Sequence, residues 1–482
     1  MKVQNEKELM AAISNCAKVD NGAVKVSDPV AFREKAIDLL IYNAVFGQTS
    51  VIRGTARWAI KSAGLDLGVF CASIEGLYEA MGRGEVKGYT VPAVNIRGMT
   101  YDVARALFHA ALQNGSGPFI FEIAKSEIDY TFQRPAEYAV VMLAAGIKEG
   151  WKGPVFVQGD HFQVNVKKYK ADPAKEVESL KKLITEAVAA GFYNIDIDTS
   201  TLVDLSKPTI YEQQRANFEV GAELTAHVRS QEPAGLTVSV GGEIGEVGEK
   251  NSTVEELEAY MDGYNASLKK HGANLRGISK VSVQTGTSHG GIPLPDGTVA
   301  QVKLDFDTLE KMSKTARNKY GLSGAVQHGA STLPDEAFHR FPEATTSEVH
   351  LATGFQNMIY DSPNLPKAMR DKMYSLLKEK FKDEWKSGQT EEQFIYKTRK
   401  KGFGLVREEL WTMPEETRVK LRGELEAKFD FLFKKLRCVN NLPDLDKYIT
   451  HVHIKPDMGK EIASADVSGA TKPVVSDNPN AD

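Results

Sequence analysis

The chain has 482 residues, of which 42% are hydrophobic and 9% aromatic, and its formal net charge is −4. This composition is typical of a globular protein, and without a basic excess we expect no nucleic-acid partner. Three cysteines far apart in sequence, Cys16, Cys71 and Cys438, argue against a disulfide scaffold. The N-terminus has no apolar core of signal-peptide length, and no apolar stretch is long enough to span a bilayer, so we expect a soluble, cytoplasmic protein with no membrane partner.

Residues 1–85 are predicted to form an N-terminal helical extension. The run VAFREKAIDLLIYNAVFG has apolar residues at helical spacing, and ASIEGLYEAMGRGE ends in glycines that would stop a helix.

Residues 86–360 alternate short apolar runs with longer amphipathic stretches. The eight runs are YTVPAVNI near 92, PFIFEI near 120, PVFVQ near 156, YNIDID near 195, LTVSVGGE near 240, KVSVQTG near 283, GAVQH near 326 and SEVHLAT near 350. Strands that are uniformly apolar are expected where both faces are buried, and eight of them alternating with helices is the rhythm of a (β/α)8 barrel. We therefore predict an α/β protein: a (β/α)8 TIM barrel with N- and C-terminal helical extensions.

The alternation of predicted strands and helices ends after the barrel. Residues 361–450 contain the amphipathic runs KAMRDKMYSLLKEKFKDEW and PEETRVKLRGELEAKFDFLFKKL, which predict a C-terminal helical extension. Residues 451–482 end in DVSGATKPVVSDNPNAD, rich in small residues, and are predicted to be a disordered tail.

Charged and imidazole side chains gather at the ends of the predicted strands. They are Asp160 and His161 at the third strand, Asp196 and Asp198 at the fourth, Glu243 at the fifth, His289 after the sixth, His328 at the seventh and His350 in the eighth. Active sites of this barrel class lie at the carboxyl ends of the strands. A lone histidine there is more often structural, but imidazoles at the third, sixth and seventh strands together match a catalytic zinc site, whose metal acts as a Lewis acid.

Small residues directly follow two of these histidines. TSHGG places Gly290 after His289, and HGAS places Gly329 and Ser331 after His328. Exposed N–H groups beside glycines bind anions, and loops after strands 7 and 8 are the usual phosphate site of these barrels. The alternative is that the glycines only turn the chain.

Over residues 86–360 the sequence resembles the class II, metal-dependent ketose-bisphosphate aldolases. The resemblance rests on six motifs in order: GYTVPAVNI, GDHF, IDTS, VGGEIG, GTSHG and QHGAS. It implies that His161, His289 and His328 hold a catalytic Zn²⁺, with another divalent cation as the alternative. The ion would polarise the ketone of dihydroxyacetone phosphate, and the enediolate formed would attack an aldehyde.

The resemblance also implies roles for the remaining residues. Asp160 would exchange a proton with the oxygen of the aldehyde partner, and Glu243 and Asp198 would lie near the metal, as an alternative metal position. The residues it places at the substrate or its phosphate are Asn95, Gly290, Gly329, Ser331, Thr353 and His350.

The base that removes the carbon proton is, in the family, a glutamate on the loop after the strand-5 motif. Here that loop, EVGEKNST, offers Glu246 and Glu249, of which we favour Glu249; the alternative is that this glutamate has a plain surface role. The following STVEEL predicts a helix start with a capping box.

The sequence departs from the family pattern where substrate is contacted. HLATG places His350 and Gly354 where the family has a pattern like NIATD, Ala124 stands in place of a serine, and Ala330 in place of a glycine. The metal and acid motifs are kept, so these departures leave the identity of the substrate open.

We therefore predict a class II aldolase, a homo-oligomer acting in carbohydrate metabolism. Its default substrate is fructose 1,6-bisphosphate, cleaved in glycolysis to dihydroxyacetone phosphate and glyceraldehyde 3-phosphate. The alternatives are an aldolase for another sugar phosphate, such as tagatose bisphosphate, and a non-catalytic or regulatory barrel subunit. A metal-dependent hydrolase would usually need a His-x-His at the first strand, and the run HVH lies at 451–453, beyond the barrel.

Overall fold

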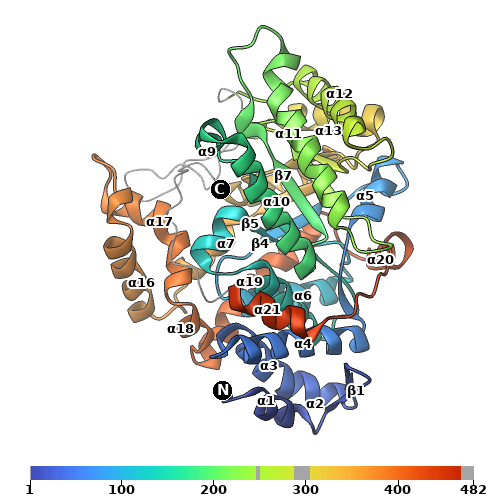
Figure 1. Ribbon diagram of the computed structural model, residues 1–482. Helices are drawn as coiled ribbons and strands as arrows, with labels where there is room; N and C mark the ends of the chain where they lie inside the picture. Colours follow the sequence, from blue (N-terminus) through green and yellow to red (C-terminus); the bar gives the residue numbers. More distant parts are fainter. Residues whose placement is uncertain (1, 246–249, 287–303, 468–482) are drawn as a thin grey trace.

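The computed structural model describes residues 2–245, 250–286 and 304–467, and its centre is a closed barrel of parallel strands (Figure 1). The barrel strands follow one another in chain order: β4 (Val91–Asn95), β5 (Ile120–Ala124), β6 (Gly153–Gln163), β7 (Asn194–Asp198), β8 (Ser239–Glu243), β9 (Lys280–Ser282), β10 (Ala325–Gln327) and β11 (Glu348–Leu351). The last strand, β11, pairs in parallel with β4 and closes the barrel. The predicted (β/α)8 fold is confirmed, with a strand at each of the eight predicted runs.

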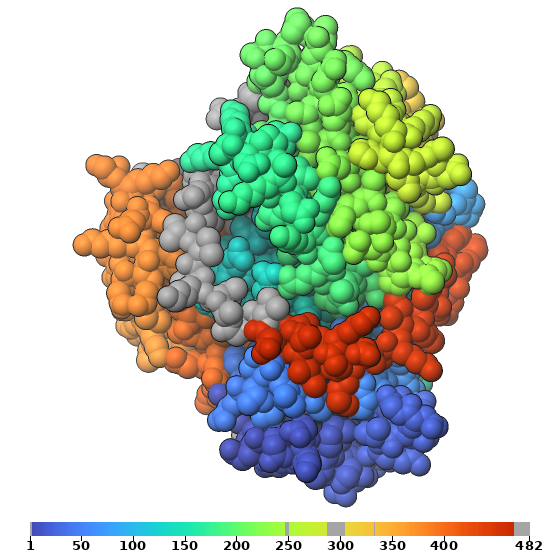
Figure 2. Space-filling view, viewed as in Figure 1, coloured from blue at the N-terminus to red at the C-terminus, as the bar shows by residue number. Residues whose placement is uncertain are grey.

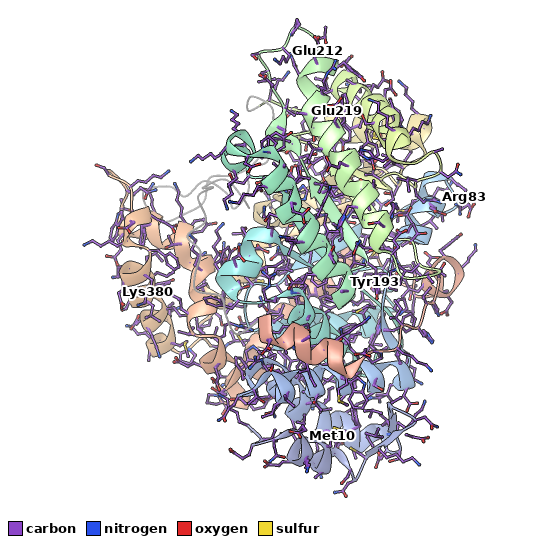
Figure 3. All side chains as sticks on the ribbon, in the orientation of Figure 1. Met10, Arg83, Tyr193, Glu212, Glu219 and Lys380 are labelled. Carbon is purple, nitrogen blue, oxygen red and sulfur yellow. The ribbon has the colours of Figure 1, made fainter. Side chains whose placement is uncertain are left out.

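Helices cover the outside of the barrel. They are α6 (Thr100–Asn114), α7 (Lys125–Thr131), α8 (Pro135–Glu149), α9 (Val166–Ala171), α10 (Pro173–Ala190), α11 (Ile210–Gln231), α12 (Val254–His271), α13 (Phe306–Tyr320), α14 (Arg340–Glu343) and α15 (Thr353–Asp361). The capping box predicted from STVEEL is present at the start of α12, where Thr253 and Glu256 cap each other's backbone N–H groups. Exposed charged side chains, among them Arg83, Glu219 and Lys380, lie on the periphery (Figure 3).

The N-terminal segment is largely helical, as predicted, and it also contains short strands that were not predicted. Its helices are α1 (Glu6–Ile13), α2 (Pro29–Ala31), α3 (Ile37–Phe46), α4 (Ser50–Leu67) and α5 (Glu75–Gly82), with a π-helical turn at Phe32–Ala36. Strands β1 (Ala17–Asp20) and β2 (Ala23–Val26) form an antiparallel hairpin whose turn residues, Asn21 and Gly22, have φ of 49° and 73°. Asn-Gly is the preferred pair for such a turn, and this signal was overlooked in the sequence.

A further strand of the N-terminal segment, β3 (Val69–Ala72), joins the sheet outside the barrel. It pairs in parallel with the first residues of β6, and β7 pairs with β6 further along. Phe70 of β3 contacts the rings of His451 and His453, with ring centroids 5.1 and 4.6 Å apart. The HVH run therefore packs against the outside of the sheet, away from the barrel mouth.

The C-terminal segment is helical and wraps back onto the rest of the molecule. Its helices are α16 (Lys367–Lys380), α17 (Glu391–Leu405), α18 (Arg407–Trp411), α19 (Glu415–Lys435), α20 (Pro443–Tyr448) and α21 (Met458–Val467). Figure 2 shows α16 and α17 standing out on one side of the molecule. One buried apolar core extends from Val3 to Ile449, so both extensions share the core of the barrel.

Helix α21 lies within the segment that was expected to be a disordered tail. It packs against α4 so closely that a Cβ on Gly54 would come within 2.3 Å of the Ile462 Cα. Lys61 of α4 forms an ion pair of 2.5 Å with Glu461, and both side chains are largely buried. The expectation of disorder is therefore wrong up to residue 467, and residues 468–482 lie outside the described part. Within the described residues, no helix combines the length and apolarity needed to cross a membrane.

Candidate metal centre and active site

A β-bulge in β6 brings Asp160 and His161 to the same site. Consecutive residues of a regular strand point to opposite faces, so the two side chains could not otherwise meet. The pairing of β6 with β7 shifts register between Gly159 and Phe162, and His161 adopts a φ of 39°. Bulges of this kind re-aim side chains beside active sites. Gly159 is required here, because a Cβ at that position would lie 2.5 Å from the Phe162 ring.

The His161 ring is held by carboxylates on β7 and β8. Its Nδ1 lies 3.2 Å from Asp198 Oδ2 and 3.4 Å from Glu243 Oε2, while its Nε2 lies 3.9 Å from Asp160 Oδ1. Burial raises the pKa of Asp198, but the contacts with His161, Ser200 and Gln163 outweigh it and lower that pKa to about 2. Asp198 is thus an ionised acceptor that fixes one ring nitrogen of His161 and leaves the other facing Asp160.

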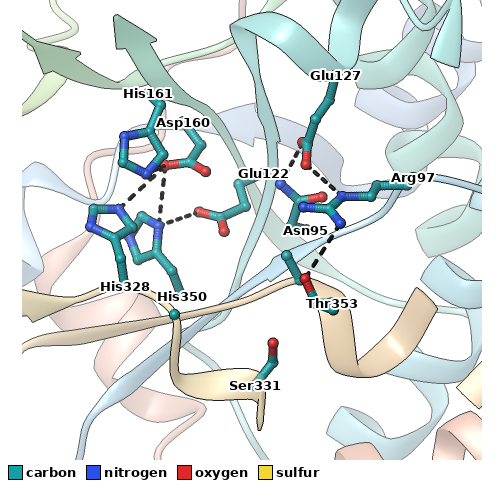
Figure 4. A pocket seen from close by; sticks show the side chains of 12 residues that line it. Asn95, Arg97, Glu122, Glu127, Asp160, His161, His328, Ser331, His350 and Thr353 are labelled. Atoms are coloured by element: carbon teal, nitrogen blue, oxygen red, sulfur yellow. Dashed lines mark hydrogen bonds and ion pairs between the residues drawn. The ribbon is translucent and has the colours of Figure 1, made fainter. Parts of the chain in front are cut away.

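His328 and His350 extend this arrangement across the barrel mouth (Figure 4). The centroid of the His328 ring lies 4.2 Å from that of His161 and 4.1 Å from that of His350. Burial and the two neighbouring imidazoles lower the pKa of His328 well below its usual range, so this ring is neutral and its lone pair can bind a cation. Asp160 Oδ1 lies 3.5 Å from His328 Nε2 and 3.2 Å from His350 Nδ1.

Beneath the mouth, the barrel interior holds charged side chains that the sequence analysis did not place in the site. Lys280 on β9 is central, with its Nζ 2.5 Å from Glu348 Oε1 and 3.0 Å from Asp196 Oδ1. Glu122 on β5 lies against His350, with 3.0 Å between its Oε2 and the ring Nδ1. A Cβ on Gly241 would lie 2.2 Å from Asp196 Oδ1, so only glycine leaves room for this network.

The pKa values of the acids in this network are shifted in different directions, because burial raises them and nearby cations lower them. Burial, reinforced by the charge of Asp160, raises the pKa of Glu122 to about 8. Burial also raises the pKa of Asp196 to about 6, although Lys280 opposes the shift. For Glu348, the charge of Lys280 and the hydrogen bonds from His350 and Gln158 outweigh burial. They lower the pKa of Glu348 far below its usual range.

The donor atoms at the mouth fit a divalent metal ion. Asp160, Asp196, His328 and His350 form one set whose ligand atoms lie within 4.8 Å of one another, and His161, Glu243 and His328 form another. Mixed imidazole and carboxylate donors at this spacing suit Zn²⁺ and related divalent ions. Of the residues predicted for metal, base and phosphate, His289, Glu249 and Gly290 lie outside the described residues.

A pocket of about 370 Å³, including its open mouth, lies beside these donors. Most of the predicted site residues line it: Asn95, Asp160, His161, His328, Gly329, Ser331, His350 and Thr353. The pocket therefore joins the expected metal ligands to the expected phosphate loops.

Arg97 is a pocket residue that the sequence analysis missed. Its buried guanidinium lies beside Thr353 (Figure 4), with Nη1 donating to Gln356 Oε1 at 2.9 Å and lying 3.5 Å from Thr353 Oγ1. Glu127 accepts a bond of 2.6 Å from its Nε and one of 2.5 Å from Asn95 Nδ2. The signal was its position two residues after Asn95, because alternate residues at a strand end face the same way.

Comparisons with known proteins give one family match and several structural neighbours. The family model described as fructose-bisphosphate aldolase class-II matches residues 77–404. A search of curated proteins finds no match.

Among solved structures, one described as "a probable tagatose 6 phosphate kinase" from Sinorhizobium meliloti has a TM-score of 0.50 and 14% identity over 78% of this chain and 97% of that one. The fructose-bisphosphate aldolase from Campylobacter jejuni has a TM-score of 0.46 and 16% identity, over 77% and 96%. The fructuronate-tagaturonate epimerase UxaE from Cohnella laeviribosi has a TM-score of 0.45 and 12% identity, over 92% and 90%. At such low identities a structural likeness concerns the fold alone.

Proposed function

The chain belongs to the class II fructose-bisphosphate aldolase family, and we propose that it catalyses metal-dependent aldol cleavage and condensation of a phosphorylated ketose. The observation that carries the proposal is the meeting of Asp160, His161 and His328 at one barrel mouth beside the Ser331 and Thr353 loops. Metal ligands, an acid–base group and an anion-binding end are the parts that such a reaction needs.

The metal end is proposed to use three histidines. We propose that His161, His328 and His289 hold a divalent ion, with Zn²⁺ as the default, and that the ion when bound polarises the carbonyl of the ketose. Asp198 and Glu243 act on His161, since both lie within 3.4 Å of its Nδ1 and so keep Nε2 directed into the site.

Asp160 is proposed to exchange a proton with the substrate hydroxyl. Burial raises the pKa of this carboxyl, but His161 and His350 outweigh burial and hold the pKa well below its usual range. Asp160 is therefore ionised at neutral pH and can accept the hydroxyl proton during cleavage, then return it during condensation. Glu249 stays the proposed base for the carbon proton.

The phosphate end is proposed to lie where the loops after β10 and β11 meet. Gly329 has a φ of 67°, and a Cβ on Gly354 would lie 2.9 Å from the Ser331 carbonyl oxygen, so the two loops are in close contact. Thr353 opens α15 at this point, and Arg97 adds a buried guanidinium. Arginine and backbone N–H groups at a helix start are favourable phosphate donors.

We propose fructose 1,6-bisphosphate as the default substrate, with tagatose bisphosphate as the alternative. His350, Arg97 and Glu122 all line the pocket, so the contacts to the sugar hydroxyls differ from what the motifs alone would imply. A cytoplasmic location and a homo-oligomeric assembly stay predictions.

The proposal is tested by incubating the metal-loaded protein with each bisphosphate and measuring dihydroxyacetone phosphate with a coupled reductase. We expect cleavage that stops when a chelator is added and resumes when Zn²⁺ is added back. His339→Asn, a change at an exposed histidine, should leave the rate unchanged. If the metal-loaded protein cleaves neither sugar, both proposed substrates are ruled out.

A further inference from the structure

We propose that His350 is itself a ligand of the metal ion, binding through Nδ1 from the eighth strand of the barrel. This inference rests on the proposed metal-dependent function and adds a ligand that the resemblance does not supply, because the family has an asparagine at this place. The inference is carried by three features of the described residues: the orientation of the ring, the spacing of the donor atoms, and the charge around them.

The orientation of the His350 ring is fixed from behind by a carboxylate. Its Nε2 lies 2.6 Å from Glu348 Oε1, and that carboxylate is held by Lys280 and by Gln158, whose Nε2 donates to the same oxygen at 2.9 Å. Histidines that bind metals almost always donate their other ring N–H to a carboxylate, a carbonyl or a water. His161 shows the same arrangement, with Asp198 behind Nδ1 and Nε2 directed into the site.

The spacing of the donor atoms matches that around one ion. His350 Nδ1 and His328 Nε2 lie 3.2 and 3.5 Å from the same oxygen, Asp160 Oδ1, and donor atoms of the two imidazoles lie within 4.8 Å of each other, so one ion can reach both rings. These three side chains are each more than nine-tenths buried. Within the described part of the chain, neither Asp160 Oδ1 nor His350 Nδ1 makes a hydrogen bond of good geometry.

The charge around His350 also favours a cation at this point. The ionised carboxylate of Asp160 lies 3.2 Å from Nδ1, while Lys280 pairs with Glu348 and Asp196 on the other side of the ring. Buried carboxylates are stable only when they are paired, protonated or bound to metal. The competing interpretation is a protonated His350 that serves as a counter-ion between the two groups of acids, with the metal held elsewhere.

The first test locates the ion in the wild-type protein. Crystals of the Zn²⁺-loaded chain, measured at the zinc absorption edge, should show an anomalous peak about 2.0–2.1 Å from His350 Nδ1. A peak bonded to His161 and His328 but remote from His350 would overturn the inference. This test needs no variant and no turnover, so it separates the failure of the ligand assignment from the failure of the proposed aldolase reaction.

The second test measures affinity with Co²⁺ as the probe, in competition with a chromogenic chelator. His350→Asn installs the residue that the family has, and it should weaken Co²⁺ binding by at least about 10- to 100-fold and change the visible spectrum of the bound ion. His339→Asn, at an exposed histidine, should change neither. Unchanged or tighter binding by His350→Asn would contradict the inference and support the counter-ion interpretation.

Discussion

Replacing Lys280 by methionine should destabilise the barrel strongly, because this one cation serves two buried carboxylates. Its side chain is 1% exposed, and its Nζ lies 2.5 Å from Glu348 Oε1 and 3.0 Å from Asp196 Oδ1. Removing one partner of a buried ion pair costs about 3–5 kcal/mol, since the other partner stays buried and unpaired. Lys280 lowers the pKa of both carboxyls, so both pKa values should rise without it, and Asp196, whose pKa is already raised to about 6, can take up a proton. We therefore expect a loss of about 3–5 kcal/mol rather than twice that figure.

The assay is urea unfolding of the metal-free protein at pH 7, followed by tryptophan fluorescence. Lys372→Met is the matched control, because Lys372 contacts Glu409 at 2.6 Å on the surface, with both side chains about half exposed. The double variant Lys280→Met/Glu348→Gln should recover part of the lost stability, since it also removes the unpaired charge. If Lys280→Met lowers the urea midpoint no more than Lys372→Met does, the interior network does not stabilise the barrel as described.

Four further outcomes follow from the site. Asp160→Asn should retain bound metal, measured by plasma emission, while turnover falls about 10²–10⁴-fold, the usual contribution of an acid–base group. His328→Ala should lose both metal and activity, and full zinc occupancy in this variant would refute the ligand set. Arg97→Met should raise KM for the bisphosphate more than it lowers kcat, and an unchanged KM would remove Arg97 from the phosphate end. Since the pKa of Glu122 is raised to about 8 in the fold, the metal-free protein should lose stability as pH rises from about 5 to 8, and Glu122→Gln should flatten that fall in thermal melts.

The strand ends of the barrel could be predicted because their pattern depends on local sequence. Parallel strands buried on both faces give continuous apolar runs, and a polar residue at the end of such a run is conspicuous. This signal was sufficient for Asp160, His161 and His328, which β6 and β10 bring together across the barrel mouth. What the sequence did not reveal is the bulge, because a φ of 39° at His161 depends on the pairing of β6 with β7.

The interior network was missed because the strands were treated as uniformly apolar. Glu122 in FIFEIA and Glu348 in SEVHLA are single acids within apolar runs, and each lies two residues before a strand-end position that was noticed, Ala124 and His350. Since alternate residues of a strand share a face, that spacing places both acids inside the barrel. Their partner Lys280 comes from a different strand, so the pairing became apparent only in the folded structure.

Helix α21 shows why composition alone misjudged part of the C-terminal segment. The prediction of disorder rested on DVSGATKPVVSDNPNAD and was extended back to residue 451, yet α21 is a helix whose Ile462 packs closely against Gly54 of α4. The partner surface lies some 400 residues away in sequence, as the Lys61–Glu461 pair illustrates, so no local pattern predicts the contact.

The most direct test of the central claim is hydrogen exchange at the carbon acid. The protein is incubated with dihydroxyacetone phosphate in heavy water, with and without a chelator, and the exchangeable carbon proton is followed by NMR. The predicted result is that the signal is lost only when the metal is present. His328→Ala should prevent this loss. Retention of the proton by a fully metal-loaded protein would contradict the assignment of an aldolase half-reaction to this site.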